Sequence, residues 1–370
     1  MPKFQPRTVR VPRYLAALAM LIGMTSVAQT ACAATIDEIA HLSGPDREKV
    51  LLEGARKEGK VTLYSAMIED QALRPVAAAF RKKYPFLQMD FWRADSRDLI
   101  NKTLAEARGR AVIGDLVEGG GVSQALRRAK VLQPFRSPML AAYDKQLYDP
   151  EGYWAATRVS YFGLAYNTRL IKSEDVPQTY DDLLNPKYKG KLCWSGSGET
   201  GGETMFITFI RLIKGDEAAD DYLRRLSEQH VITYMSSARE AVNKTMEGEC
   251  GIALNIFLHH PIISARKGAS VAPKPLDPVE MNASVVTLAK GSQHPHAAML
   301  LIDYLLSREA QEILEGANYF PAHPDAEPSK MLASIIPSKI GMKTKFVSEE
   351  VLFKERTKSL ALQKKYFGAR

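Results

Sequence analysis

The feature that most constrains the fold of this chain is a repeated alternation of short β-rich runs with helical stretches. In the first half, "VTLYSA" at residues 61–66 precedes a helical period over residues 69–83, and "FLQMDFWRA" precedes "SRDLINKTLAEARG". "GDLVE" is followed by another helical stretch. Strands that alternate with helices predict an α/β fold with right-handed crossovers and a mainly parallel sheet flanked by helices.

A second set of alternating elements begins after Arg158. It comprises "YFGLAYNT", "KGKLCWSG", a helix from Glu203, a strand near residues 231–234, a helix over residues 238–247 and "GIALNIF". "ASVVTLAKG" and one long helix, "HAAMLLIDYLLSREAQEIL", then indicate a return to the first set. A chain of 370 residues exceeds what one hydrophobic core usually serves, so we expect two lobes that share hinge strands and enclose a cleft.

The expected organisation has five parts. Residues 1–33 form a signal peptide and residues 34–157 form the first part of lobe 1. Residues 158–281 form lobe 2, residues 282–322 return to lobe 1, and residues 323–370 form a C-terminal helical segment that packs on lobe 2.

The N-terminus has the pattern of an export signal. Four basic residues precede an apolar run over residues 14–28, which is too short for a stable membrane-spanning helix, and "TACAA" suits a signal-peptidase cut after Ala33. Lipid attachment at Cys32 is an alternative, although Gln29 stands where a lipoprotein signal favours leucine. We therefore expect a protein exported to the periplasm.

Removal of the four basic residues of the leader lowers the formal net charge from +8 to +4. The remaining basic residues are scattered along the chain and are not interleaved with aromatic residues. The composition therefore gives little support to nucleic-acid binding.

Two cysteines, Cys193 and Cys250, remain after the cut. Each lies in a short apolar run, "KLCWS" or "ECGIALNIF", that is typical of a buried strand. An oxidising compartment allows them to pair, and we predict a disulfide across neighbouring strands of the second lobe. A zinc site would need more ligands nearby.

The stretch "WSGSGETGGETMFITFI", residues 194–210, places small residues directly before an apolar helix. The first backbone N–H groups of a helix lack intrahelical partners and face outward at the positive end of its dipole, which favours an anion. The alternative is that Gly201, Gly202 and Thr204 only let the chain turn and cap the helix.

Five phrases carry a family resemblance: "VTLYSAMIEDQALRPVAAAFRKKYP", "YFGLAYNTRLI", "YDDLLNPKYKGKL", "GDEAADDYLRRL" and "HPHAAMLLIDYLLSREAQEIL". In this order they resemble family 1 extracellular solute-binding proteins of ABC importers, in the branch that includes the ferric-ion-binding proteins. The resemblance implies a two-lobed Venus-flytrap fold, a ligand held in the interlobe cleft, and delivery to an inner-membrane permease driven by an ATPase. It also implies a monomer that closes by hinge motion.

The resemblance further implies where ferric ion would bind, and this sequence departs from that pattern. The family's histidine position falls on Ile68, its glutamate near Gly120, and its adjacent tyrosine pair on Phe257 and Leu258. None of these side chains can ligate iron(III), so we predict that bare ferric ion does not bind in the family's manner.

Two alternatives involving a metal remain open. Glu118, His259 and His260 lie close to those positions and could supply a different metal site, although a histidine pair before Pro261 is also typical of a helix start or a cleft wall. Iron could also arrive as a chelate.

The anion-binding half of the family's site is retained. By the same matching, its loop is Thr200, Gly201 and Gly202, and its asparagine is Asn255. We predict that Gly201 and Gly202 present free N–H groups to the cleft, and that Gly202→Val weakens binding far more than folding. The expected ligand-binding residues are Ser65, Arg93, Glu118, Gly119, Arg158, Thr200, Gly201, Gly202, Glu203 and Asn255.

The charged residues near this loop leave the ligand class partly open. Guanidinium groups match a carboxylate or phosphonate by paired hydrogen bonds, although Arg93 and Arg158 could instead form surface or interlobe ion pairs. Glu118, Glu199 and Glu203 would repel an anion but could receive an ammonium group. The expected ligand is therefore a small anionic or zwitterionic solute, such as an organic acid, a phosphonate or a phosphorylated compound.

A secreted enzyme acting on a small anionic substrate is the competing class. The chain has no "GxSxG", no "GxxxxGK[ST]" and no "HExxH". We therefore expect a binding protein without catalytic residues or a cofactor, while a structural or adhesive protein would have no cleft ligand at all.

Overall fold

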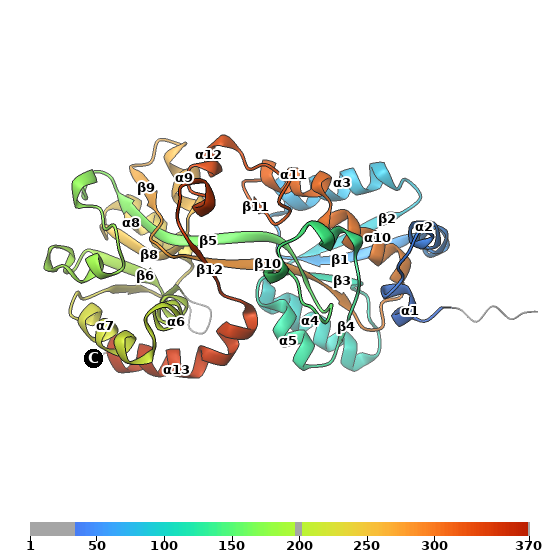
Figure 1. Cartoon of the computed structure of the whole chain (residues 1–370), viewed down its shortest axis with the longest axis horizontal. Coiled ribbons are helices and arrows are strands. Elements are labelled where there is room, and N and C mark those ends of the chain that lie inside the picture. The colour runs from blue at the N-terminus through green and yellow to red at the C-terminus, as the bar shows by residue number, and fades with distance from the viewer. Residues whose placement is uncertain (1–33, 197–201, 369–370) are drawn as a thin grey trace, which may run out of the picture. The chain divides into compact units, whose positions relative to one another are not determined.

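The computed structural model describes residues 34–196 and 202–368 (Figure 1). The predicted signal peptide, and residues 197–201 of the glycine-rich stretch, lie outside these ranges. Within the described residues, no helix combines the length and apolar character that a membrane span requires.

The first lobe is built on three parallel strands, in which β1 pairs with both β2 and β3. Each strand is followed by a helical segment, as the alternating pattern predicted. The strands are β1 (Lys60–Ser65), β2 (Gln88–Arg93) and β3 (Leu116–Gly119). The helices are α1 (Ile36–Ala40), α2 (Arg47–Glu58), α3 (Arg74–Lys83) with the preceding π-helical turn Glu69–Leu73, α4 (Ser96–Gly109) and α5 (Val122–Arg128).

The second lobe repeats this arrangement, because β6 pairs in parallel with both β7 and β8. Its strands are β6 (Leu192–Ser195), β7 (Ile232–Tyr234), β8 (Ile252–Phe257) and the antiparallel β9 (Val271–Lys274). Its helices are α6 (Gly202–Lys214), α7 (Asp216–Ser227), α8 (Ala238–Glu247) and α9 (His259–Ala265).

Two long antiparallel strands, β5 (Ala155–Asn167) and β10 (Val279–Ala289), join the lobes. β10 pairs with β3 of the first lobe, and β5 pairs with β8 of the second. The strand order is β2-β1-β3-β10-β5-β8-β6-β7, so one continuous sheet runs through both lobes. The predicted α/β fold, with two lobes and shared crossing strands, is confirmed.

The long helix expected from "HAAMLLIDYLLSREAQEIL" is instead two helices, α10 (Pro295–Leu306) and α11 (Arg308–Gly316). Ser307 between them has an extended backbone, with φ −74° and ψ 153°, and its side chain accepts a hydrogen bond from the Ala310 N–H. Serine favours this capping position over a helix interior, because its hydroxyl competes for backbone hydrogen bonds.

The C-terminal segment contributes β11 (Phe320–Pro321), α12 (Lys330–Ala333), β12 (Thr344–Phe346) and the long helix α13 (Glu349–Phe367). The Ser348 side chain caps α13 by accepting from the Val351 N–H. Acidic residues in the first turn and basic residues in the last complement the helix dipole. α13 lies against α6 and α7 of the second lobe and also against α5 of the first.

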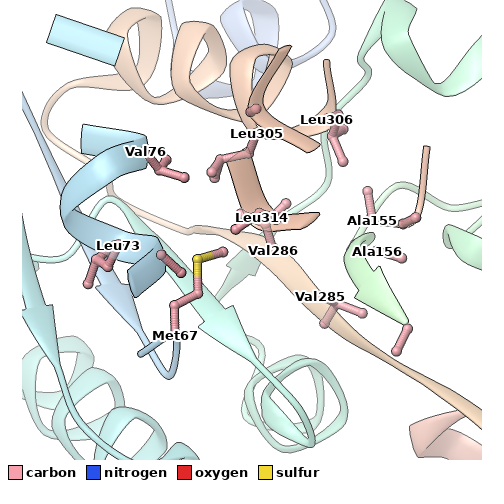
Figure 2. Close-up of a cluster of buried hydrophobic side chains, with 14 of the residues drawn as sticks. Met67, Leu73, Val76, Ala155, Ala156, Val285, Val286, Leu305, Leu306 and Leu314 are labelled. Carbon is pink, nitrogen blue, oxygen red and sulfur yellow. The ribbon is translucent and has the colours of Figure 1, made fainter. Parts of the chain in front are cut away.

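Two clusters of buried apolar side chains hold these layers together. The larger fills the first lobe, where side chains from α3, β5, β10, α10 and α11 meet (Figure 2), and it continues into the second lobe with residues of β8, α8 and α9. The second lies in the second lobe around Trp194, Phe206 and Tyr222. The larger cluster therefore joins the two lobes along β5 and β10, and the second lobe has a further cluster of its own.

The predicted disulfide between Cys193 and Cys250 is confirmed. Cys193 lies in β6 and Cys250 lies two residues before β8, the neighbouring strand, and their Cα atoms are 6.1 Å apart. The bond closes a loop that contains β7 and the helices α6, α7 and α8.

Candidate functional site

A cavity of about 660 Å³ is enclosed by both lobes, the crossing strands and the C-terminal segment. Its lining comes from the ends of elements that face one another across β5 and β10. First-lobe lining residues are Ala66, Ser96, Ile100, Gly120, Gly121, Gln124, Ala125 and Arg128; second-lobe residues are Thr204, Met205, Thr208 and Phe257. The crossing strands add Arg158, Ser160, Phe162, Asn282, Ala283 and Ser284, and the C-terminal segment adds Val347, Glu349, Leu352, Phe353 and Arg356.

A second cavity of about 580 Å³ shares Gln124, Arg128, Ala283 and Glu349 with the first. Its described lining comes from α5, residues 149–154, β10 and the segment before and at the start of α13, without a contribution from α6 or β8. The larger cavity is lined by both lobes and by the crossing strands, so we take it as the candidate site.

The charged side chains that line the larger cavity are mostly cationic. Arg128, Arg158 and Arg356 contribute guanidinium groups, and Glu349 contributes the carboxylate among the described lining residues. Glu349 is already hydrogen-bonded to the beginning of α5. The cavity therefore favours an anionic group on a ligand.

Arg158 is held by a buried ion pair with Glu118. Glu118 lies in β3 and is fully buried; its Oε1 also accepts from Thr157 Oγ1 at 2.9 Å, and its Oε2 accepts from Ser65 Oγ at 2.7 Å. The Arg158 guanidinium stacks on the Tyr319 ring, 4.7 Å from its centroid. The ion pair that was left open as an alternative for Arg158 is therefore present. Glu118 and Ser65 hold Arg158 in place and do not themselves line the cavity.

The beginning of α6 differs from the expectation. The Gly202 N–H is not free, because it donates to Ser195 Oγ at 3.0 Å, and Asn255 Nδ2 donates to the Gly202 carbonyl at 3.3 Å. A Cβ atom added at Gly202 would lie 2.8 Å from Ser195 Oγ, so Gly202→Val would disturb the helix start itself. Glu199, Thr200 and Gly201 lie outside the described residues.

The remaining predicted ligand-binding residues lie outside the cavity lining. Arg93 ends β2 on the surface, with its Nε 3.4 Å from the Met67 carbonyl. Glu203 is buried, and its carboxylate bonds with the Gln363 side chain of α13. Gly119 ends β3 one residue before the lining residue Gly120, and a Cβ atom there would lie 3.0 Å from Ser96 Oγ.

The positions that would ligate ferric ion carry side chains without donor atoms. Ile68 is 44% exposed, and Leu258 is fully buried in the core. Phe257 lines the cavity, with its ring centroid 4.5 Å from that of Phe162. Across residues 34–196 and 202–368, no group of three or more His, Cys, Asp or Glu side chains is placed to hold a metal ion.

His259 and His260 lie at the start of α9 and outside the cavity lining. Their ring centroids are 4.6 Å apart, and neither Nδ1 has a hydrogen-bond partner in the described part of the chain. Burial lowers the pKa of His259 to about 4, with Arg158 and Arg239 adding to the effect. Burial, then His259 and Arg239, lower the pKa of His260 to about 3. Both rings are therefore neutral at pH 7.

We expect this pair to make the fold sensitive to acid. Because the pKa of each ring is lower in the folded state than the ordinary 6.5, the unfolded chain binds more protons below that pH. The free energy of unfolding should fall by about 2 kcal/mol or more between about pH 7 and about pH 4.5 from this pair. Urea denaturation of the protein and of the His259→Gln/His260→Gln variant at both pH values isolates the effect. An equal acid-induced loss in the two proteins would contradict it.

Sequence reasoning missed several lining residues: Arg128, Phe162, Glu349, Phe353 and Arg356. The signal that could have found some of them is the polarity of α13, whose first turns combine apolar and basic residues after a capping serine. Of the apolar pair Phe257 and Leu258, which was also expected to give the cleft an apolar wall, Phe257 lines the cavity and Leu258 is buried in the core.

Comparison with known proteins places this geometry in context. Residues 114–335 match the family model described as "Bacterial extracellular solute-binding protein". An uncharacterized protein of Haemophilus influenzae is 25% identical over 270 residues, covering 70% of this chain and 76% of that protein. A putative 2-aminoethylphosphonate-binding periplasmic protein of Salmonella typhi is 24% identical over 243 residues, covering 62% of this chain and 68% of that protein.

Among solved structures, the chain resembles the Trichodesmium protein FutA in complex with iron and citrate ligands. The TM-score is 0.72 at 20% sequence identity, and the match covers 84% of this chain and 100% of that one. At this identity the likeness shows a shared two-lobed fold.

Proposed function

Because this chain belongs to the family of bacterial extracellular solute-binding proteins, we propose that it captures a small anionic or zwitterionic organic solute in the cavity between its lobes. It delivers that solute to a membrane permease driven by an ATPase. Export to the periplasm, with cleavage of the leader after Ala33, belongs to the same proposal.

The observation that carries the proposal is the pairing of three guanidinium groups with an apolar wall in one cavity. Arg128, Arg158 and Arg356 approach it from α5, β5 and α13. Guanidinium groups bind carboxylate, phosphonate and phosphate groups through paired hydrogen bonds. The beginning of α6 adds the positive end of a helix dipole on the second-lobe side, where Thr204 lines the cavity.

The rest of the lining suits the carbon skeleton of such a solute. Phe162 and Phe257 form an aromatic wall on the crossing strand and the second lobe, and Met205, Leu352 and Phe353 extend it. A volume of about 660 Å³ lies within the range of cavities that enclose small organic ligands. An inorganic ion alone would leave this apolar surface without a partner.

The ligand names of similar proteins agree with this solute class. The Salmonella typhi relative is named for 2-aminoethylphosphonate, a zwitterion, and the FutA structure holds citrate, an organic acid, together with iron. A bare ferric ion fits less well, because Ile68, Gly120, Phe257 and Leu258 supply no oxygen or nitrogen side-chain ligand.

We expect phosphonates or carboxylates to raise the thermal unfolding temperature, because a ligand that binds only the folded state stabilises it by mass action. The panel comprises 2-aminoethylphosphonate, citrate, hexose phosphates and ferric chloride, measured by differential scanning fluorimetry. At least one organic anion should shift the unfolding temperature, and ferric chloride alone should not.

Two matched variants locate the binding site. Arg128→Met removes a cavity charge, while Arg225→Met removes an exposed charge on α7, away from the lining. The ligand-induced shift should fall in Arg128→Met and persist in Arg225→Met. A shift with ferric chloride alone, or equal losses in the two variants, would oppose the proposal.

A further inference from the structure

The C-terminal helix α13 contacts both lobes. Its first turns lie against α5 of the first lobe, and the rest lies along α6 and α7 of the second (Figure 1). Leu352, Phe353 and Arg356 of this helix also line the cavity between the lobes. α13 is therefore both a wall of the candidate site and a bridge across it.

Glu349 fastens the first turn of α13 to the first lobe. Its Oε1 accepts from the Gly121 N–H at 2.5 Å, and its Oε2 accepts from Ser123 Oγ at 2.6 Å and from the Gln124 N–H at 3.1 Å. One carboxylate thereby satisfies two backbone donors at the beginning of α5, which carries no capping side chain of its own. Hydrogen bonds to a charged acceptor are the stronger kind.

A second contact on the same side reinforces this attachment. The Arg128 guanidinium at the end of α5 lies over the Phe353 ring, 4.1 Å from its centroid. Glu349 and Phe353 are four residues apart and therefore project from the same face of α13. This face of the helix meets the first lobe along the length of α5.

The remainder of α13 is tied to the second lobe at several points. Ser359 Oγ bonds with Thr208 Oγ1 at 2.8 Å, and the buried Arg211 of α6 bonds with Glu355 Oε2 at 2.8 Å. Near the C-terminus, Tyr366 donates to Asp220 at 2.8 Å. These contacts spread over three turns, so the second-lobe attachment is the stronger of the two.

The crossing strands offer a place where the lobes can move relative to each other. The pairing of β5 with β10 shifts register between Ser284 and Val285, beside the cavity-lining Ser284. Such irregularities interrupt the ladder of hydrogen bonds and allow a strand to bend. If the strands bend there, the weaker attachment of α13, at Glu349, has to separate.

We propose that α13 is a latch, in which Glu349 is the positioning residue that holds the helix to the first lobe and closes one wall of the cavity. The inference deepens the proposed function and rests on it only in taking this cavity as the ligand site. Opening the cavity breaks the three hydrogen bonds of Glu349 and the Arg128–Phe353 contact, while α13 travels with the second lobe. A bound solute is enclosed by Leu352, Phe353 and Arg356, which makes these residues determinants of specificity.

The latch is tested on the ligand-free protein by the distance between two spin labels. One label replaces Arg97, in the first turn of α4, and the other replaces Met235, which directly follows β7. Both positions are exposed, and each label is attached after substitution with cysteine. Glu349→Gln keeps the shape of the side chain but replaces one acceptor oxygen with a donor that faces other donors. Electron paramagnetic resonance should show a new population at longer distance in Glu349→Gln.

Glu350→Gln is the matched control, because it removes the same charge from the same helical turn at an exposed position. It should keep the distance distribution of the unsubstituted protein. Ser123→Ala removes one donor to Glu349 and should produce a smaller shift, which keeps the test decisive if Glu349→Gln fails to fold. Unchanged distances in both Glu349→Gln and Ser123→Ala would overturn the latch. This result is independent of ligand binding, which the fluorimetry panel measures separately.

Discussion

Replacing Arg158 with methionine should lower the free energy of unfolding by about 3–5 kcal/mol, because it leaves the Glu118 carboxylate buried without its cation. Glu118 is fully buried, and its two remaining hydrogen bonds come from the neutral hydroxyls of Ser65 and Thr157. Neither hydroxyl replaces the charge of a guanidinium group. Urea denaturation at pH 7, followed by circular dichroism, measures the loss.

The double variant Glu118→Gln/Arg158→Met should recover much of this stability, since it leaves no buried charge unpaired. An exposed pair on α11, Arg308 with Glu312, serves as the matched control. Arg308→Met should change the free energy of unfolding by less than about 1 kcal/mol. A loss of that small size in Arg158→Met would contradict the prediction.

Removing the disulfide should have an effect of similar size. The Cys193→Ala/Cys250→Ala variant should unfold with a free energy lower by roughly 4 kcal/mol, because the bond restricts an unfolded chain over a separation of 57 residues. This value follows from loop-closure entropy, and other accounts of disulfide stabilisation assign part of it to enthalpy. Chemical denaturation of the exported protein and the variant gives the difference.

Dithiothreitol provides the internal control for the disulfide. It should destabilise the unsubstituted protein toward the value of the double-alanine variant and leave the variant unchanged. Alkylation of the unreduced protein that labels both Cys193 and Cys250 would contradict the pairing.

Most of the fold could be predicted because its signals are local. The alternation of apolar runs with helical periods located β1, β3 and α8, and the positions of Cys193 and Cys250 in two apolar runs indicated the disulfide. The division of the predicted long helix at Ser307 was missed, since the apolar period continues through the serine. The Ser307 hydroxyl caps α11, and this interaction ends α10 although the apolar pattern continues.

The candidate site was harder to predict because its residues are brought together from distant parts of the chain. Arg128 and Phe353 are in contact although more than 200 residues separate them. Arg158 was found from its place near the crossing, but whether it pairs with Glu118 depends on the registers of β10 with β3 and with β5, which place Val286 opposite Glu118 and Ser284 opposite Arg158. The Gly202 N–H was expected to be free, and the Ser195 hydroxyl that binds it could not be assigned from spacing.

We propose that the cavity between the lobes holds a small anionic organic solute. The direct test is mass spectrometry of the exported protein after purification without added ligand. Native spectra measure the intact complex, and denaturation then releases the copurified solute for identification. We expect a bound organic acid, phosphonate or phosphorylated compound in one-to-one ratio, with occupancy reduced in Arg128→Met and retained in Arg225→Met. A bound ferric ion without an organic partner, or a neutral or cationic solute that Arg128→Met leaves in place, would contradict the proposed function.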